Sequence, residues 1–425
     1  MGLGLFVILL VFLALNVPVY LALILSSWLS MGLSTNIPSQ IIVQRMFSGI
    51  DKFSLMAVPF FIFAANIMNR GGLAPRIVRL ANTLVGHVHG GLAFTVVLSC
   101  MFLGAVSGSA PATVIAICAL MMPIMLKAGY DKSFVLGLII ASGSVAVIIP
   151  PSIGMVVYGA VTGTSVGELF AGGFLPGIVY GLAFMVYSYI YARRKRIPLQ
   201  PRSTLREAFA SFRQAGWALG IPVVILGGIY GGICTPTEAA GIAVVYSILV
   251  GMFIYREISW KALIEEAYKS AVGTAQVMII LAGAAVFAWL MTRFRVPDAL
   301  ATSIFALGSS RTAILLMMNL ILLIAGMFLD PASIQMIMAP LFLPLAVSVG
   351  VDPVHLGLIM VVNGAIGMFT PPFGLNLFVA SGITGTPLAE LSRKVWVWVG
   401  LSLVALGLIT YVPGITMLLP GLMFR

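Results

Sequence analysis

The feature that most constrains this chain is a set of breaks that occurs twice inside its hydrophobic segments. Small polar residues and proline interrupt one apolar stretch at Ser107–Pro111, and Asp330 and Pro331 interrupt another. The surrounding residues recur at a spacing of 221 positions, as 344 − 123 = 221 shows for the prolines after each break. The residues with a counterpart at this spacing are Pro123, Gly129, Asp131, Gly143, Pro150 and Pro151. Interrupted hydrophobic segments in matching places of two halves indicate the binding site of a secondary transporter.

Composition places most of the chain in lipid or against other membrane helices. Of its 425 residues, 61% are hydrophobic and 8% are charged, and the mean hydropathy is +1.13. Soluble domains carry roughly 25% charged residues. The net charge of +11 therefore belongs to the loops, and we expect no nucleic-acid partner. The chain has no Walker A pattern and no cluster of catalytic acid, base and nucleophile, so an enzyme is the least favoured class.

The lengths of the apolar segments predict an all-α polytopic membrane protein. A helix needs about 20 apolar residues to cross a bilayer. The runs within 90–126 and 312–349 are shorter, because a break divides each of them, and this predicts two re-entrant helical hairpins. Segments 133–163 and 353–383 each carry a double proline, which interrupts a helix and predicts two broken helices. The other expected membrane helices are 3–29, 53–69, 167–192, 217–233, 236–255, 272–292 and 395–420.

The distribution of Lys and Arg orients these segments, because both residues are more frequent in cytoplasmic loops. The densest basic cluster begins at Arg193–Arg196, and we place its loop on the cytoplasmic side. With this orientation, 17 of the 23 basic residues lie on the cytoplasmic side and 6 lie outside. Lys127 and Lys132 of the first copy correspond to uncharged Ser348 and Pro353 of the second, which predicts inverted repeats. The expected divisions are a first repeat over 1–192 with scaffold helices in 3–69, a basic cytoplasmic loop with a linking helix over 193–235, and a second repeat over 236–425.

Three amphipathic stretches, 73–80, 260–267 and 297–300, alternate charged and apolar residues at helical spacing. This pattern is typical of helices that lie in the membrane interface. Such helices either connect rigid parts or cover the surface without a mechanical role. Thr235-Pro-Thr-Glu238 has the pattern of a capping box, so the expected role of Glu238 is to cap the following helix.

Both breaks carry oxygen-rich residues where a broken helix exposes its backbone groups. Carbonyls at the end of one helix can coordinate a hard cation, and N–H groups at the start of the next can face an anion. Oxygen donors without thiolate or imidazole favour Na⁺ over a transition metal. The first expected sodium site comprises Ser107, Gly108, Ser109, Ser142 and Gly143, with Thr113 and Ser144 beside it. The second comprises Gly326, Asp330, Asn363, Gly364 and Gly367, with Ser333 and Thr370 beside it.

Packing is the alternative explanation for these residues, because Gly, Ser and Thr let membrane helices approach closely. The inverted duplication, with its prolines, favours ion binding. Asp330 can act as a functional intramembrane carboxylate or as the N-cap of a helix that begins at Pro331, and both roles can hold together. An anion site between the two tips is expected to involve Ser109, Pro150, Ser152, Asp330, Thr370 and Pro371.

Four motifs together resemble one known family over essentially the whole chain. They are Gly104–Ser109 (GAVSGS), Pro150–Gly154 (PPSIG), Gly228–Ala240 (GIYGGICTPTEAA), and Asn363–Gly364 followed by Thr370–Pro372. The combination is similar to the large membrane subunit, of the DctM or SiaM type, of the tripartite ATP-independent periplasmic (TRAP) transporters. The length resembles the unfused form of this subunit.

The resemblance implies an elevator-type transporter of the ion transporter superfamily in the bacterial inner membrane. It implies Na⁺ as the coupling ion, a separate small four-helix membrane subunit, and a periplasmic binding protein that delivers a carboxylate. Among the family's substrates, general resemblance favours sialic acid, with C4-dicarboxylates next. The family's two sodium sites map onto Ser107, Ser109 and Gly143 and onto Gly326, Gly364 and Gly367.

Two other functions remain open from the sequence. The first is a self-sufficient sodium-coupled carboxylate carrier of a related inverted-repeat family, which needs no partner protein. The second is a passive ion channel built on the same hairpins. Uptake by the purified chain alone favours the carrier, and sodium-dependent accumulation above equilibrium excludes the channel.

Overall fold

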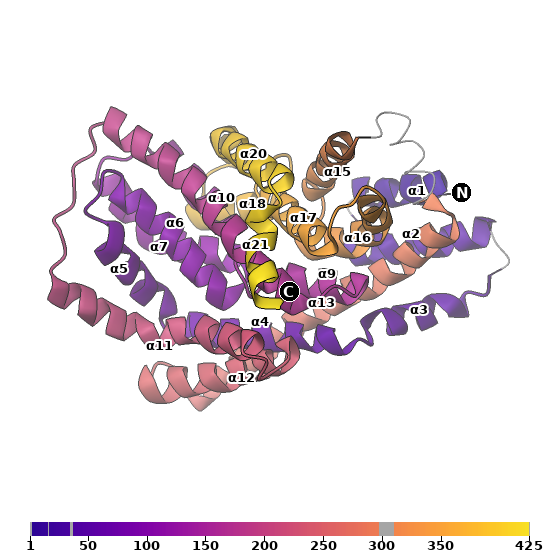
Figure 1. Ribbon diagram of the computed structural model, residues 1–425, viewed down its shortest axis with the longest axis horizontal. Coiled ribbons are helices and arrows are strands. Elements are labelled where there is room, and N and C mark those ends of the chain that lie inside the picture. Colours follow the sequence, from indigo (N-terminus) through magenta and orange to yellow (C-terminus); the bar gives the residue numbers. More distant parts are fainter. Residues whose placement is uncertain (1, 16, 35–36, 297–309, 425) are drawn as a thin grey trace.

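The computed structural model describes residues 2–15, 17–34, 37–296 and 310–424, and within these ranges the chain is helical and contains no strand (Figure 1). Seven helical segments of this part are long and apolar enough to cross a membrane. The number is eight if α19 (Leu388–Lys394) and α20 (Trp396–Tyr411), which meet at 48°, count as one span. The expectation of an all-α polytopic membrane protein is therefore confirmed.

Two helical hairpins and two interrupted helices lie where the breaks in the sequence predict them. The first hairpin is α6 (Gly91–Ser107) with α7 (Ala110–Lys127), and the second is α15 (Arg311–Gly326) with α16 (Pro331–Ser348). The first interrupted helix is α8 (Lys132–Gly143), continued by a 3₁₀ turn η2 (Ser144–Val147), and then α9 (Ile153–Thr162). The second is α17 (Pro353–Gly367) with α18 (Leu375–Thr384). Each interruption contains the double proline, where the backbone lacks donors to continue a helix.

The remaining helices surround these four units. They are α1 (Gly2–Ala14), α2 (Val19–Ser34), α3 (Gln40–Ile50), the 3₁₀ turn η1 (Phe53–Met56), α4 (Ala57–Arg70), α5 (Leu73–Val85), α10 (Val166–Arg194), α11 (Leu205–Tyr230), α12 (Pro236–Leu249) with a π turn η3 (Val250–Ile254), α13 (Trp260–Arg293) and α21 (Gly414–Phe424). The long helix α13 packs against α2, α3, α4 and, in the second hairpin, α16. It therefore joins the outer helices to the central units.

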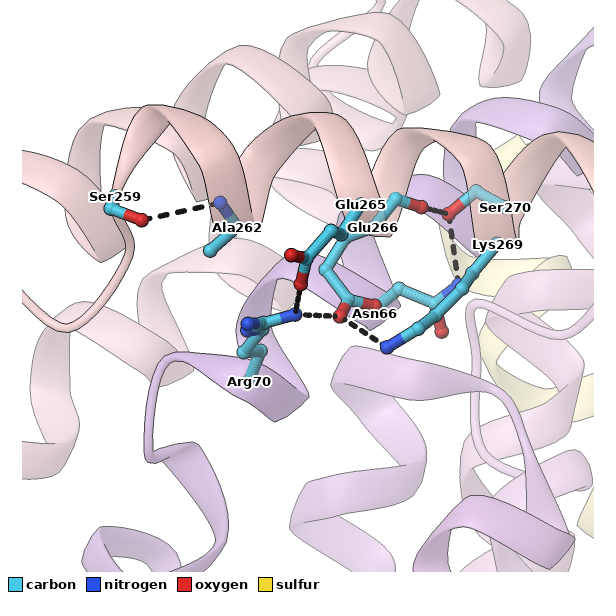
Figure 2. Close-up of polar contacts among 8 residues, drawn as sticks. All are labelled: Asn66, Arg70, Ser259, Ala262, Glu265, Glu266, Lys269 and Ser270. Carbon is cyan, nitrogen blue, oxygen red and sulfur yellow. Dashed lines mark hydrogen bonds and ion pairs between the residues drawn. The ribbon is translucent and has the colours of Figure 1, made fainter.

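A polar cluster fixes α4 to the start of α13 (Figure 2). The Arg70 guanidinium donates to Glu265 and to Glu266, at 2.8 Å in both cases. Lys269 also donates to Glu266 at 2.8 Å, and the Asn66 amide donates to the Ser270 hydroxyl at 2.8 Å. The Glu266 side chain is only 8% exposed, so its charge is compensated by two cations where water is largely excluded.

Helix starts follow local capping chemistry. Thr235 and Glu238 form the predicted capping box of α12: the Thr235 hydroxyl accepts from the Glu238 N–H at 3.3 Å, and the Glu238 carboxylate accepts from the Thr235 N–H at 2.8 Å. Thr204 and Glu207 form the same arrangement at α11. The capping role predicted for Glu238 is confirmed.

Four expectations about helix extent need correction or lie outside the described residues. The single helix expected over 3–29 is wrong, because α1 ends at Ala14 and α2, which packs against α1, begins only after Pro18. The single helix over 395–420 is wrong for the same reason, since Pro413 separates α20 from α21. Residues 260–267 are not a separate interface helix but the first turns of α13, because no breaker follows them. The stretch 297–300 lies outside the described residues.

Candidate functional site

The tip of the first hairpin is a two-residue turn between α6 and α7. Gly108 has a φ of +56°, a left-handed conformation that favours glycine, and its N–H donates to the Gly104 carbonyl at 2.8 Å. The backbone then extends through Ser109, whose N–H donates to the Ser107 hydroxyl at 3.3 Å. The Thr113 hydroxyl donates to the Ser109 carbonyl at 2.8 Å. The turn is therefore held by its own small side chains.

This tip lies directly against the first interrupted helix. A Cβ on Gly108 would lie 2.9 Å from the Pro151 carbonyl oxygen, and a Cβ on Gly104 would lie 2.5 Å from the Ala146 Cα. The second helix of the hairpin, α7, also touches the interrupted helix: a Cβ on Gly143 of α8 would lie 2.3 Å from the Val114 side chain of α7. The fold thus brings the first hairpin and the first interrupted helix into contact, with Gly108 and Gly143 of the predicted site at that contact. The small residues do allow close packing, as the alternative explanation requires.

Among the described residues, the side chain of Ser142 in the first site is fully buried without a hydrogen-bond partner. The neighbouring Ser144 hydroxyl differs, because it donates to the Ala141 carbonyl at 2.7 Å. Ser152 is also satisfied, with its hydroxyl donating to the Val147 carbonyl at 2.6 Å across the break. A buried oxygen without a partner is costly, so the Ser142 hydroxyl suits a bound cation or water.

The second tip shows the same contacts with its interrupted helix. A Cβ on Gly367 would lie 2.5 Å from the Gly326 carbonyl oxygen, and a Cβ on Gly364 would lie 3.0 Å from the Pro331 ring. Asp330 is the N-cap of α16: its Oδ2 accepts from the N–H groups of Ala332 at 3.0 Å and Ser333 at 3.2 Å. Its Oδ1 accepts from the Ser333 hydroxyl. The capping role of Asp330 is therefore present, and a role in ion binding stays a prediction.

Asn363 carries the unpartnered oxygen of the second site. Its Nδ2 donates to the Asn319 side chain at 2.7 Å and to the Ile359 carbonyl at 2.8 Å, while its fully buried Oδ1 has no hydrogen-bond partner in the described part of the chain. Thr370 is satisfied, because its hydroxyl donates to the Ile366 carbonyl at 2.7 Å. Asn363 occupies the repeat position of Ser142, since 363 − 142 = 221. The two copies therefore place a buried, unpartnered side-chain oxygen at the same position.

A buried polar chain behind Asn363 was not predicted from the sequence. Asn319 on α15 donates from Nδ2 to the Thr410 hydroxyl of α20 at 3.1 Å. The Thr410 carbonyl lies 3.1 Å from Nε2 of His355, whose Nδ1 lies 2.7 Å from the Thr416 hydroxyl. Asn319 is an isolated polar residue within an apolar helix, and this pattern in the sequence is the signal that indicates a buried polar contact. This series of hydrogen-bonded side chains positions the Asn363 amide.

Elements of the two copies cross at the centre of the molecule. In the second hairpin α16 packs on α9, and in the first hairpin α7 packs on α18 (Figure 1). The Tyr158 hydroxyl donates to the Pro353 carbonyl at 2.7 Å, and the Asn376 amide donates to the Ile140 carbonyl at 3.3 Å. Each hairpin thus adjoins the interrupted helix of its own copy and the end of the other one. Among the described residues no group of three or more His, Cys, Asp or Glu could hold a metal ion.

The arrangement of hairpins and interrupted helices defines a class of membrane transporter fold. Similar solved structures are the YdaH transporter of Alcanivorax borkumensis, with a TM-score of 0.60 at 15% identity over 89% of this chain and 90% of that one, and MtrF of Neisseria gonorrhoeae, with a TM-score of 0.58 at 13% identity over 87% and 83%. At this identity the likeness concerns the fold alone.

Sequence comparison gives the family. Residues 6–415 match the DctM component of the tripartite ATP-independent periplasmic transporters. The chain is 45% identical to the C4-dicarboxylate large permease DctM of Pseudomonas aeruginosa, over 89% of this chain and 88% of the relative. It is 42% identical to the isethionate permease DctMQ of Oleidesulfovibrio alaskensis, over 96% of this chain and 65% of the relative. It is 40% identical to the ectoine/5-hydroxyectoine permease UehC of Ruegeria pomeroyi, over 92% of each.

The chain belongs to the DctM family of TRAP transporter large permeases. It is a multi-pass protein of the bacterial inner membrane, and its class is transport rather than catalysis. The resemblance drawn from the four motifs is confirmed.

Proposed function

We propose that this permease imports a small organic acid together with Na⁺, using one sodium site at each hairpin tip. The observation that carries the proposal occurs in both copies: Ser142 Oγ and Asn363 Oδ1 are each fully buried beside a glycine of the interrupted helix, and neither has a hydrogen-bond partner among residues 2–15, 17–34, 37–296 and 310–424. Hydroxyl, amide and carbonyl oxygens are ligands that suit a hard cation. Na⁺ at both positions would satisfy these oxygens and fix the tips.

Ordered tips would create the anion site between them. We propose that Ser109, Asp330, Pro150 and Pro371 line this anion site, together with Ser152 and Thr370. No Lys or Arg lies deep in the apolar segments, so helix N-termini and hydroxyls would bind the anion. The membrane potential would supply work, at about 2.3 kcal/mol per charge and 100 mV. We propose an elevator motion in which the hairpin-bearing units move against the outer helices.

The substrate we propose first is a C4-dicarboxylate. The relatives named here transport, by their names, C4-dicarboxylate, isethionate and ectoine, which are all small acids or zwitterions. Sialic acid, which the sequence resemblance favours, finds no support in these names and becomes the second choice. By membership of a tripartite family, the partners are a small four-helix membrane subunit and a periplasmic binding protein.

Uptake into proteoliposomes tests this function. The permease is reconstituted with its small subunit, with or without the binding protein, and with an inward gradient of Na⁺ or of K⁺ as the control. We expect labelled succinate to accumulate only with both Na⁺ and the binding protein, and labelled sialic acid is tested in parallel. Uptake without the binding protein would instead identify a self-sufficient carrier. Equilibration without accumulation would identify a channel.

A further inference from the structure

Gln335 is a buried polar side chain of the second hairpin. It lies on α16 with no exposed surface, and neither its Oε1 nor its Nε2 has a hydrogen-bond partner among the described residues. Burying an amide costs free energy, because its oxygen and its nitrogen both lose hydrogen bonds to water. A ligand that binds these atoms offsets this cost. Neither the predicted sodium sites nor the predicted anion site includes this residue.

The repeat places Gln335 beside the second sodium site. It corresponds to Val114, since 335 − 114 = 221, and Val114 is the side chain that contacts Gly143 in the first copy. The counterpart of Gly143 is Gly364, which lies against Pro331. A Cβ built on Gly364 would be 3.0 Å from the Pro331 Cβ. Residues four apart share a helix face. Gln335 therefore lies one turn beyond Pro331 on the same side of α16, and Pro331 is the residue of α16 that contacts Gly364 of α17.

The second copy has two buried amides, of which Asn363 stands where the first copy has Ser142 and Gln335 stands where it has Val114. The Ser333 hydroxyl is occupied by Asp330, so it is not a counterpart to the serines of the first tip. Asn363 Oδ1 and Gln335 Oε1 are instead two fully buried amide oxygens that have no hydrogen-bond partner in the described part of the chain, and they lie on helices that pack together. Amide oxygens are good ligands for a hard cation. A valine in the equivalent first-copy position supplies no such ligand.

We propose that Gln335 Oε1 is a ligand of the cation at the second hairpin, beside Asn363 Oδ1. This inference rests on the proposed sodium coupling and adds a ligand that makes the two sites chemically different. The first site would bind Na⁺ through serine hydroxyls and backbone carbonyls. The second would bind it through two side-chain amides and backbone carbonyls.

Sodium-dependent thermal stability tests the proposal without relying on transport. The permease with its small subunit is titrated with NaCl at constant ionic strength, choline chloride being the replacement, and the unfolding midpoint is recorded. The variants are Gln335→Met, which keeps the volume but loses both polar atoms, and Gln335→Val, which installs the residue of the first copy. Gln335→Glu restores an oxygen ligand. The matched control is Gln44→Met, because Gln44 is an exposed glutamine on α3.

We expect a Na⁺-dependent rise in the unfolding midpoint of the unmodified protein. In Gln335→Met and Gln335→Val, the Na⁺ concentration at the midpoint of one binding step should rise at least about tenfold. In Gln335→Glu and Gln44→Met, this Na⁺ concentration should stay close to that of the unmodified protein. If the unmodified protein responds to Na⁺ and both apolar variants respond equally, the role of Gln335 is overturned while sodium coupling stands. No Na⁺ response in the unmodified protein would overturn the sodium coupling itself. If one apolar variant does not fold, the other decides, together with Gln335→Glu.

Discussion

Gly326 and Gly367 are in direct backbone contact: a Cβ on Gly367 would lie 2.5 Å from the Gly326 carbonyl oxygen and 2.6 Å from its Cα. Gly104 and Ala146 make the corresponding contact in the first copy, where a Cβ on Gly104 would lie 2.5 Å from the Ala146 Cα. In both copies the end of the first hairpin helix thus touches the interrupted helix through backbone. In the second copy the Gly326 carbonyl oxygen lies at this contact, so the proposed ion site there depends on the contact being kept.

Gly367→Ala should therefore damage the second tip. The added methyl group meets backbone atoms rather than a flexible side chain, and overpacking of this kind costs about 1–3 kcal/mol. We expect a lower unfolding midpoint and reduced uptake. Gly407→Ala on α20 is the matched control, since a Cβ there meets nothing within 4 Å and the change should be neutral or slightly stabilising. Equal midpoints for the two variants would show that the backbone contact tolerates a methyl group.

Replacing Asp330 separates its capping role from a role in ion binding. Asp330→Ala removes the acceptor for the Ala332 and Ser333 N–H groups, and loss of an N-cap costs about 1 kcal/mol. Asp330→Asn retains a capping oxygen but not the charge, so it should keep most of the stability. If Asp330 also tunes the sodium site, Asp330→Asn should still weaken uptake and raise the Na⁺ concentration needed for half-maximal rate. An unchanged sodium dependence would leave Asp330 as a cap only.

The cluster of Figure 2 predicts unequal effects for two adjacent glutamates. Glu266→Ala leaves Arg70 and Lys269 without their shared, nearly buried acceptor, and loss of a charged hydrogen bond costs about 1.5–3 kcal/mol. Glu265→Ala removes a carboxylate that is 43% exposed, so its effect should be clearly smaller. Unfolding midpoints of both variants, alone and with Arg70→Ala, measure the coupling. Additive effects of Glu266→Ala and Arg70→Ala would contradict the contact.

Asp131 at the start of α8 should give a pH-dependent contribution to stability. Hydrogen bonds from Lys195 and then from Tyr191 hold the pKa of this carboxyl below its usual value. The contribution is therefore complete above about pH 4, the unfolded value, and is lost as the pH falls through the folded pKa. The difference in unfolding midpoint between the unmodified protein and Asp131→Asn should shrink below about pH 4. In a Lys195→Met background the difference above about pH 4 should be smaller but not abolished, because the Tyr191 hydrogen bond to Asp131 remains.

The sequence predicted the breaks better than it predicted the ends of the helices. Double prolines and left-handed glycines act locally, so the interrupted helices around Pro150 and Pro371 and the tip at Gly108 could be placed from residue types alone. The start of α13 could not, because residues 260–267 are amphipathic by themselves and only their continuation makes them part of one helix. The division at Pro413 was missed because the apolar run continues across it.

The sequence by itself determined that this protein is a helical membrane permease with a duplicated pair of broken segments. Hydropathy, proline and glycine positions and the spacing of 221 residues are all properties of the chain as written. Only the tertiary structure decided which oxygens at the breaks lack partners. Ser144, Ser152 and Thr370 donate their hydroxyls to nearby carbonyls, whereas Ser142 Oγ, Asn363 Oδ1 and both polar atoms of Gln335 have no hydrogen-bond partner among the described residues. The physical reason is that hydrogen-bond satisfaction depends on which groups meet in the packed helices, and this follows from contacts between segments distant in sequence.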